Sequence, residues 1–343
     1  MFDITKAAIK AIGPDKPDDW ELKPRHHAES IMQEAGAVIR ILESDELNEI
    51  IGHYDEADAE AVAEQERYKW YSKLAAVTSF LSVGIGSLLL LLYVIEEMRP
   101  FTQYIAVLQF VLLVISFGAS LYVSRKEQFE IWMRKRAEAE TARLGLFNSV
   151  MQRQETAKDG ELPLLPLKLE YFRRFQLDIQ LYYYKTRGEQ HARAIRGMNW
   201  LRILALMLVS LAVFPVALSA FNIGVPGKLI AGIEDDVFQR VFMFLGLIGA
   251  ALQGLLASFA LISLHQRNAA RYHDTYQNLE DLSGKPLSEA REAAVNGDES
   301  SVLAFVALVH EQISSEHREW VALRSLDPDL RLKTLREIGL PRL

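Results

Sequence analysis

Four uncharged, apolar runs of membrane-spanning length are the feature that most constrains this 343-residue chain. They cover about residues 74–95, 101–124, 203–225 and 241–264. As a helix, the first run reaches about 33 Å, which matches a hydrocarbon core of roughly 30 Å. Within each pair, the short connection carries charged residues that are too polar for lipid. The pattern predicts an all-α integral membrane protein with four transmembrane helices in two hairpins.

The distribution of basic residues predicts the orientation of these hairpins. Lysine and arginine near the end of a span are retained on the cytoplasmic side. Lys69 and Lys73 precede the first span and Arg125 and Lys126 follow the second, whereas Arg99 alone lies between them. The second hairpin has the same bias. We therefore expect a multi-pass protein of the inner (plasma) membrane, with both termini and a long-helix middle region in the cytoplasm.

Composition and motifs argue against several other functions. The formal net charge of −7 disfavours a nucleic-acid partner. The absence of cysteine excludes disulfides, a thiol nucleophile and thiolate metal ligands. His310 and His317 would lie about 10 Å apart along a helix, too far to share a zinc ion. With no phosphate loop, G-x-S-x-G or H-E-x-x-H motif, the sequence predicts no enzyme, catalytic residue, cofactor or metal site.

The two halves of the chain share one order of features. Each has a charged helix, a tryptophan, a span, a short loop, a second span and another charged helix, and "ERYKWYSKLAAVTSFLSV" aligns with "IRGMNWLRILALMLVSLAV". Gly160, Pro163 and Pro166 interrupt helix between the halves. We predict an N-terminal cytoplasmic segment at 1–25, a first helix/two-span/helix unit at 26–160 and a second at 161–343.

Two apolar stripes with helical spacing lie outside the spans. Each is expected to run along one helix and to need a partner, within the chain or on another subunit. The stripes are Ile31, Ala35, Val38 and Leu42, and Val302, Phe305, Val309 and Ile313.

Small and polar residues within the spans are candidates for helix packing or for lining a pore. A ridge of small residues at four-residue steps lets helix backbones approach closely, either within the chain or between subunits. The glutamines are expected to cross-link helices or to face a narrow pore. Because no span carries an ionised residue at depth, a proton relay is disfavoured. These candidates are Gln109, Ser116, Ser120, Gly246, Ala250, Gln253, Gly254 and Ser258.

A basic run beside three tyrosines leads into the third span. It is explained by the positive-inside rule and anionic lipid, or by a cytoplasmic pocket for a phosphorylated signal, since arginine binds phosphate and tyrosine stacks on bases. The candidate contacts to lipid or to an anionic ligand are Arg173, Arg174, Tyr183, Arg187, Arg193 and Arg196.

The stretch "YFRRFQLDIQLYYYKTRGEQHARAIRGMNWLRI", followed by a span, a loop and a span, resembles the SLATT family of two-transmembrane effector domains that associate with SMODS and SLOG proteins in prokaryotes. Arg173 or Arg174, Asp178 and Gln180 carry the likeness, together with the three tyrosines at 182–184; Ile179 separates the acidic residue from the glutamine. The first half looks like a diverged copy, so the chain would be a tandem of such units.

This resemblance implies an oligomeric membrane effector, a gated channel or pore in defence or stress signalling. Its partners would be the lipid bilayer, further copies of the same chain, and a nucleotide second messenger or a sensor protein as the trigger. The alternative is a non-conducting membrane scaffold that recruits partners through its cytoplasmic helices.

Overall fold

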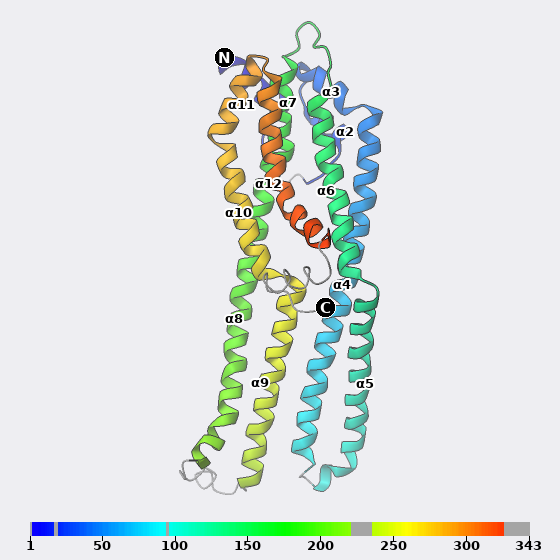
Figure 1. Cartoon of the computed structure of the whole chain (residues 1–343), viewed down its shortest axis with the longest axis vertical. Helices are drawn as coiled ribbons and strands as arrows, with labels where there is room; N and C mark the ends of the chain where they lie inside the picture. The colour runs from blue at the N-terminus through cyan, green and yellow to red at the C-terminus, as the bar shows by residue number, and fades with distance from the viewer. Residues whose placement is uncertain (1, 17–19, 94–95, 221–234, 326–343) are drawn as a thin grey trace. The chain divides into compact units, whose positions relative to one another are not determined.

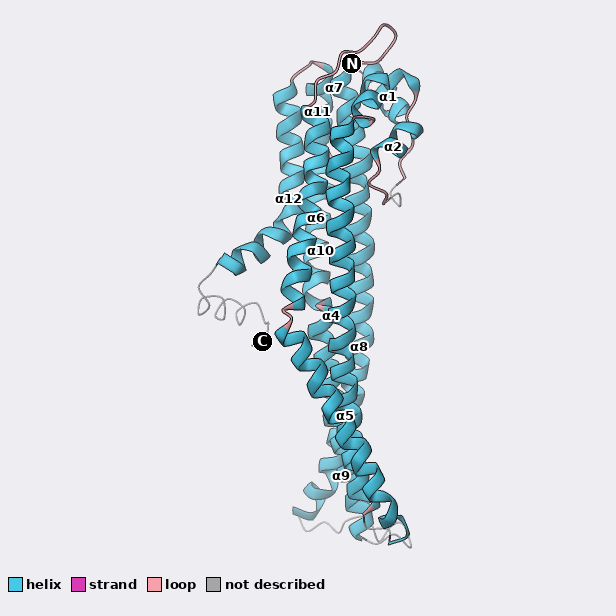
Figure 2. Ribbon diagram, turned by 90° about the vertical axis from the view of Figure 1, so that its right-hand side faces the viewer, coloured by secondary structure: helices cyan, strands magenta, loops and turns pink. Residues whose placement is uncertain are grey.

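The computed structural model describes residues 2–16, 20–93, 96–220 and 235–325, and this part of the chain is helical with no strand (Figures 1 and 2). The all-α prediction is confirmed. The helices are α1 (Phe2–Ile12), α2 (Pro24–Ser30), η1 (Gln33–Ala35), α3 (Gly36–Leu42), α4 (Asp45–Leu92), η2 (Glu96–Met98), α5 (Arg99–Arg125), α6 (Gln128–Gln152), α7 (Leu164–Phe172), the π-turn η3 (Arg173–Leu177), α8 (Asp178–Ala220), α9 (Asp235–Ser263), α10 (His265–Ser283), α11 (Lys285–Val295) and α12 (Glu299–Ser325).

The chain divides into two compact units, and each takes segments from both halves of the sequence. We call the unit of Met1–Glu64, Glu130–Gln190 and Arg267–Leu343 the outer bundle, and the unit of Gln65–Phe129 and His191–Gln266 the span bundle. The long helices α4 and α8 contribute residues to both. The predicted repeat of residues 26–160 and 161–343 stays a prediction.

The outer bundle is built around α7 and the π-turn. Residues 166–177 are buried without exception, and α1, α3, α11 and α12 all contact α7. The predicted stripe Val302, Phe305, Val309 and Ile313 lies on α12 and is buried in this core. A helix apolar on one face therefore covers a segment that is buried on every face.

The other predicted stripe is buried as expected, but it does not lie on one helix. Ile31 has an extended backbone after α2, Ala35 belongs to η1, and Val38 and Leu42 lie on α3. All four side chains reach the core. The prediction of a single helix is wrong, because the spacing of apolar residues reports burial and a short break changes direction without exposing them.

Helix is interrupted where the sequence predicted a boundary near residue 161. α6 ends at Gln152, Gly160 has a φ of +87° that suits glycine, and Pro163 precedes the first residue of α7. Pro166 does not break helix, since it lies in the first turn of α7, where its missing N–H has no helical acceptor.

In the span bundle, four helices are long and apolar enough to cross a membrane. Only 6% of the most apolar stretch of α5 is buried, and Phe110 and Phe117 are more than 60% exposed. The predicted spans 101–124 and 241–264 coincide with α5 and α9 to within one residue at their C-terminal ends. The first span ends with α4 at Leu92, and the predicted residues 94–95 and 221–225 lie outside the described part. Pro215 lies within α8.

Helices of the span bundle meet where side chains are small. A Cβ placed on Gly246 would lie 2.5 Å from the Cβ of Ala212, and one on Gly249 would lie 2.8 Å from the carbonyl oxygen of Ala205. Both contacts join α9 to α8. By contrast, a Cβ on Gly254 would lie within 4 Å of no atom in the part of the chain that the structure describes. Gly249 therefore lies closer to α8 than Gly254 does. The four-residue spacing of the predicted ridge did not include Gly249.

We predict that Gly249→Ala destabilises the protein whereas Gly254→Ala does not. The added methyl group at 249 must push α8 away, and overpacking of this kind typically costs about 1–3 kcal/mol. Thermal denaturation of the purified chain in detergent would measure the difference. Equal melting temperatures for Gly249→Ala and the unmodified chain would contradict the close packing of α8 on α9.

Candidate functional site

The π-turn at Arg173–Leu177 is the most unusual local structure in the outer bundle. The backbone N–H of Asp178 donates to the carbonyl oxygen of Arg173, five residues earlier. In an α-helix, residues five apart point in different directions, but the wider π-turn returns the fifth residue to the same face. Arg173 and Asp178 therefore pair directly. Turns of this type frequently occur at functional sites.

Arg173 is the centre of a cluster of charged side chains. Its Nε donates to Glu170 at 2.7 Å and its Nη2 to Asp15 at 2.8 Å, in addition to the pair with Asp178. Arg291 of α11 donates to both carboxylate oxygens of Glu170, at 2.6 and 3.0 Å. We call these five residues the Arg173 cluster. When all are ionised, three carboxylates face two guanidinium groups, which leaves one excess negative charge.

Burial and the neighbouring charges both shift the pKa values of Asp178 and Arg173. Burial raises the pKa of Asp178 to about 6, and Asp15 and Glu170 contribute in the same direction, while Arg173 opposes the change. For Arg173, burial lowers the pKa, but the three carboxylates together outweigh it and the pKa lies above its usual value. Burial, together with the carboxylates of Asp15 and Glu170, therefore makes Asp178 easier to protonate, whereas Arg173 stays charged.

The other ionised side chains of the buried segment also have partners within the protein. Lys168 Nζ donates to the carbonyl oxygen of Met151 at 2.8 Å, which satisfies a group in the last turn of α6. Burial lowers the pKa of Lys168, and Glu299 opposes this. Arg174 donates to the carbonyl oxygen of Ile12 at the end of α1, and its guanidinium lies over the ring of Phe175.

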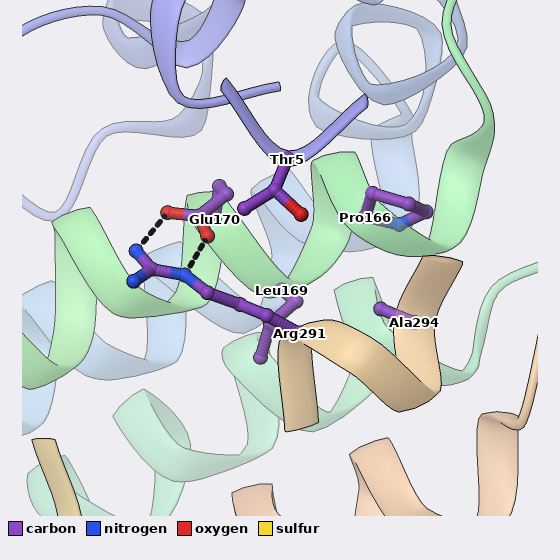
Figure 3. A pocket seen from close by; sticks show the side chains of 6 residues that line it. All are labelled: Thr5, Pro166, Leu169, Glu170, Arg291 and Ala294. Carbon is purple, nitrogen blue, oxygen red and sulfur yellow. Dashed lines mark hydrogen bonds and ion pairs between the residues drawn. The ribbon is translucent and has the colours of Figure 1, made fainter. Parts of the chain in front are cut away.

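A small hollow lies beside the cluster and is lined by Thr5, Pro166, Leu169, Glu170, Arg291 and Ala294 (Figure 3). It leaves no room for a water-sized molecule, and the Arg291–Glu170 pair forms part of its wall. Drug-sized ligands usually occupy about 300–1,000 Å³. The charges of the cluster are directed at one another, so its arrangement is that of a structural clasp between helices.

The predicted anion-binding residues lie in different surroundings. Arg173 and Arg174 are buried and their side chains donate to protein groups. Arg187, Arg193 and Arg196 are exposed on α8. Tyr183 is half-buried, with its ring 5.4 Å from that of Trp20 and 5.8 Å from the guanidinium carbon of Arg187. Arg173 thus belongs to the Arg173 cluster and Arg174 binds the end of α1, while anion or lipid contact remains a prediction for the exposed arginines.

Polar residues of the predicted spans make contacts between helices. Ser116 of α5 donates to the carbonyl oxygen of Ala75 on α4 at 2.9 Å, and Gln253 of α9 donates to that of Arg202 on α8 at 3.0 Å. The side-chain amide of Gln109 lies against Gly86, where a Cβ would leave no room. These contacts favour the helix-linking role of the glutamines over the pore-lining role.

The ridge of small residues on α9 does not pack as one surface within the chain. Gly246 meets α8, but Ala250 and Gly254 are exposed and Ser258 donates to Gly254 in its own helix. Ser120 of α5 is also exposed. For Ala250 and Gly254, packing against a span of the same chain is therefore not seen among the described residues. The alternative interpretation, contact with another subunit, stays a prediction.

One contact between titratable side chains had no signal in the sequence. His191 and His265 are 74 residues apart, and their Nδ1 atoms lie 2.7 Å from each other. Neither histidine has a second ligand-type residue at helical spacing, which is why spacing alone could not pair them.

Comparison with protein-family models, with curated proteins and with solved structures gives no match to this chain. Its function has therefore to be inferred from its own residues.

We predict that Arg173→Ala strongly destabilises the protein. The substitution leaves three carboxylates near one another with one guanidinium, and removing one partner of a buried ion pair typically costs about 3–5 kcal/mol. Arg153→Ala is a matched control, because Arg153 pairs with Glu46 at the surface, where both side chains are more than a third exposed, and such pairs contribute about 0–1 kcal/mol. Thermal denaturation in detergent would compare the two. A similar small decrease in melting temperature for both variants would exclude the Arg173 cluster as a major source of stability.

Proposed function

We propose that this chain is a multi-pass protein of the inner membrane that oligomerises and opens a gated pore in response to a cytoplasmic signal. The observation that carries the proposal is the inverted polarity of the span bundle. Its large apolar side chains face outward, whereas Ser116 and Gln253 direct their polar groups to neighbouring helices. This arrangement is costly in water and suits lipid.

Aromatic residues at the predicted interfaces support the membrane assignment. Trp70 is 58% exposed and Trp200 is 74% exposed, and each precedes an uncharged run by a few residues. Tyr93 and Tyr104, at the other end of the first hairpin, are also more than 60% exposed. Indole and phenol rings favour the boundary between lipid and water. The basic residues beside Trp70 and Trp200 support a cytoplasmic location for those ends.

The exposed part of the small ridge supports assembly from several chains. Ala250 and Gly254 present a flat strip among larger apolar residues, and such strips allow close helix contact in membranes. Since the spans have no ionised side chain at depth, transport by a proton relay is disfavoured and a passive pathway is favoured. The resemblance to SLATT domains, with Arg173 and Asp178 in the matching motif, points to the same function.

The proposed trigger is a nucleotide signal or a sensor protein that acts on the cytoplasmic helices. The exposed Arg187, Arg193 and Arg196 offer charge for an anionic partner. Enzyme activity is not part of the proposal, because neither the motifs nor the charge clasp suggest a reaction.

We predict that both termini and the segment between α6 and α7 face the cytoplasm. The chain has no native cysteine, so a single introduced cysteine reports on one position only. In intact cells, Glu97→Cys in the first external loop should react with an impermeant maleimide, whereas Asp159→Cys should react only after lysis. Both positions are exposed to solvent. Labelling of Asp159→Cys in intact cells would overturn the orientation.

We predict that Gly254→Leu reduces both the oligomeric mass and the ion flux of the chain in liposomes loaded with an ion-sensitive dye. The leucine would obstruct close contact between copies, because a Cβ at this position meets no other helix among the described residues. Gly118→Leu is the matched control. Gly118 is also exposed and a Cβ there would meet no described atom within 4 Å, but it lies among large side chains on α5.

The same measurement separates the pore from the alternative function. Unchanged mass and flux in Gly254→Leu would contradict the role of the ridge. An unmodified chain that forms an oligomer but stays sealed with every nucleotide tried would favour the non-conducting scaffold.

A further inference from the structure

The contact between His191 and His265 links α8 to the first residue of α10. The two Nδ1 atoms are 2.7 Å apart and the ring centroids 5.0 Å apart, so the rings share one hydrogen bond. Both residues belong to the span bundle and lie outside the predicted spans, among basic residues. Neither takes part in the Arg173 cluster.

The histidine contact lies at a strained break in the backbone. α9 ends at Ser263, and Leu264 has a φ of +49° before α10 begins at His265. The left-handed conformation is unfavourable for a residue with a side chain. Interactions of the adjacent residues must hold the break in place, and the bond from His265 to α8 is directly next to it.

The charges around the pair make it sensitive to protons and unattractive to metal ions. Burial lowers the pKa of His265, and Lys69 and Lys73 of α4 lower it further. Two nitrogen ligands beside two ammonium groups make a poor cation site, since zinc sites in proteins have at least three protein ligands. The group that the pair can gain or lose is therefore a proton.

The protonation state decides whether the contact can form. Two neutral rings share one N–H···N bond, and a single added proton leaves one donor and one acceptor. When both rings are protonated, neither has an acceptor at the shared position, and two positive charges face each other beside Lys69 and Lys73. We propose that His191 and His265 form a proton-operated latch that joins α8 to the start of α10 near neutral pH and opens in acid.

The pH range follows from the direction of the shift. An unperturbed histidine titrates near pH 6.5. Since the folded environment favours the neutral form of His265, the contact is complete above this value. Because the contact survives the first proton, it is lost only as the second proton binds, at a pH below this value and toward the lowered pKa of His265. The latch does not depend on whether the spans form a pore.

The experiment measures the distance across the latch directly. Gln190→Cys on α8 and Ala270→Cys on α10 place spin labels at exposed positions of a chain without native cysteine. With EDTA present, pulsed electron paramagnetic resonance at about pH 8 should give one short distance between the two spin labels. At about pH 5 that population should fall severalfold, with longer distances appearing. The same distance distribution at both pH values would overturn the latch.

Two further variants assign the change to the pair. In His191→Asn, the amide oxygen accepts from His265 whether or not that ring is protonated, so the short distance should persist at about pH 5. His273→Asn is the control, because His273 is an exposed histidine on the same helix α10, and it should respond to acid as the unmodified chain does. Loss of the short distance in His191→Asn at about pH 5, or loss of the acid response in His273→Asn, would assign the change to another group.

Discussion

The outer bundle depends on the pairing of charges that its own folding buries. Residues 166–177 lie at the centre of the core and include Lys168, Glu170, Arg173 and Arg174. An ion moved from water into a protein interior loses several kcal/mol of solvation, so such a segment can be buried only where each charge meets a partner. Because Arg173 has three carboxylate partners, it ties the loop after α1 to α7, α8 and, through Glu170 and Arg291, α11. The π-turn is part of this solution, since it brings Asp178 onto the face of Arg173.

The span bundle, to which α4 and α8 also contribute, has to expose apolar side chains instead of burying charged ones. Along α4 and α8 the composition changes from charged to uncharged, and the side chains that face outward change from polar to apolar. Apolar burial cannot hold helices together in lipid, so small residues and hydrogen bonds take that role. Gly246 and Gly249 allow α9 to approach α8, and Ser116 and Gln253 bond to the carbonyl groups of neighbouring helices. The polar atoms of these two side chains are thus directed away from the surface.

Each second span is followed by a residue in the left-handed conformation, and the duplication stays a prediction. Glu127, two residues after the end of α5, has a φ of +47°, and Leu264, directly after the end of α9, has a φ of +49°. In the alignment of "FGASLYVSRKEQ" with "LLASFALISLHQ", these breaks differ by one position. The halves differ elsewhere, because the first begins with the broken sequence of α2, η1 and α3, whereas the second begins with α7 and its π-turn. The histidine contact is specific to the second half, because His265 follows Leu264, whereas a glutamine, Gln128, follows Glu127.

The sequence by itself determined the helical class, the four apolar runs and the C-terminal ends of the second and fourth spans, because hydrophobicity and charge act locally and need no knowledge of neighbours. It also identified the apolar stripe of α12 and the interruption near residue 161. Tertiary structure alone decided which face of α9 meets α8, since Gly249 and Gly254 are equivalent as sequence but differ in what lies opposite. It also decided that Arg173 and Arg174 are core residues, because their partners Asp15 and Ile12 are more than 150 residues away in the chain. The pairing of His191 with His265 has the same origin: contacts between distant segments follow from the packing of whole helices, and no local pattern encodes them.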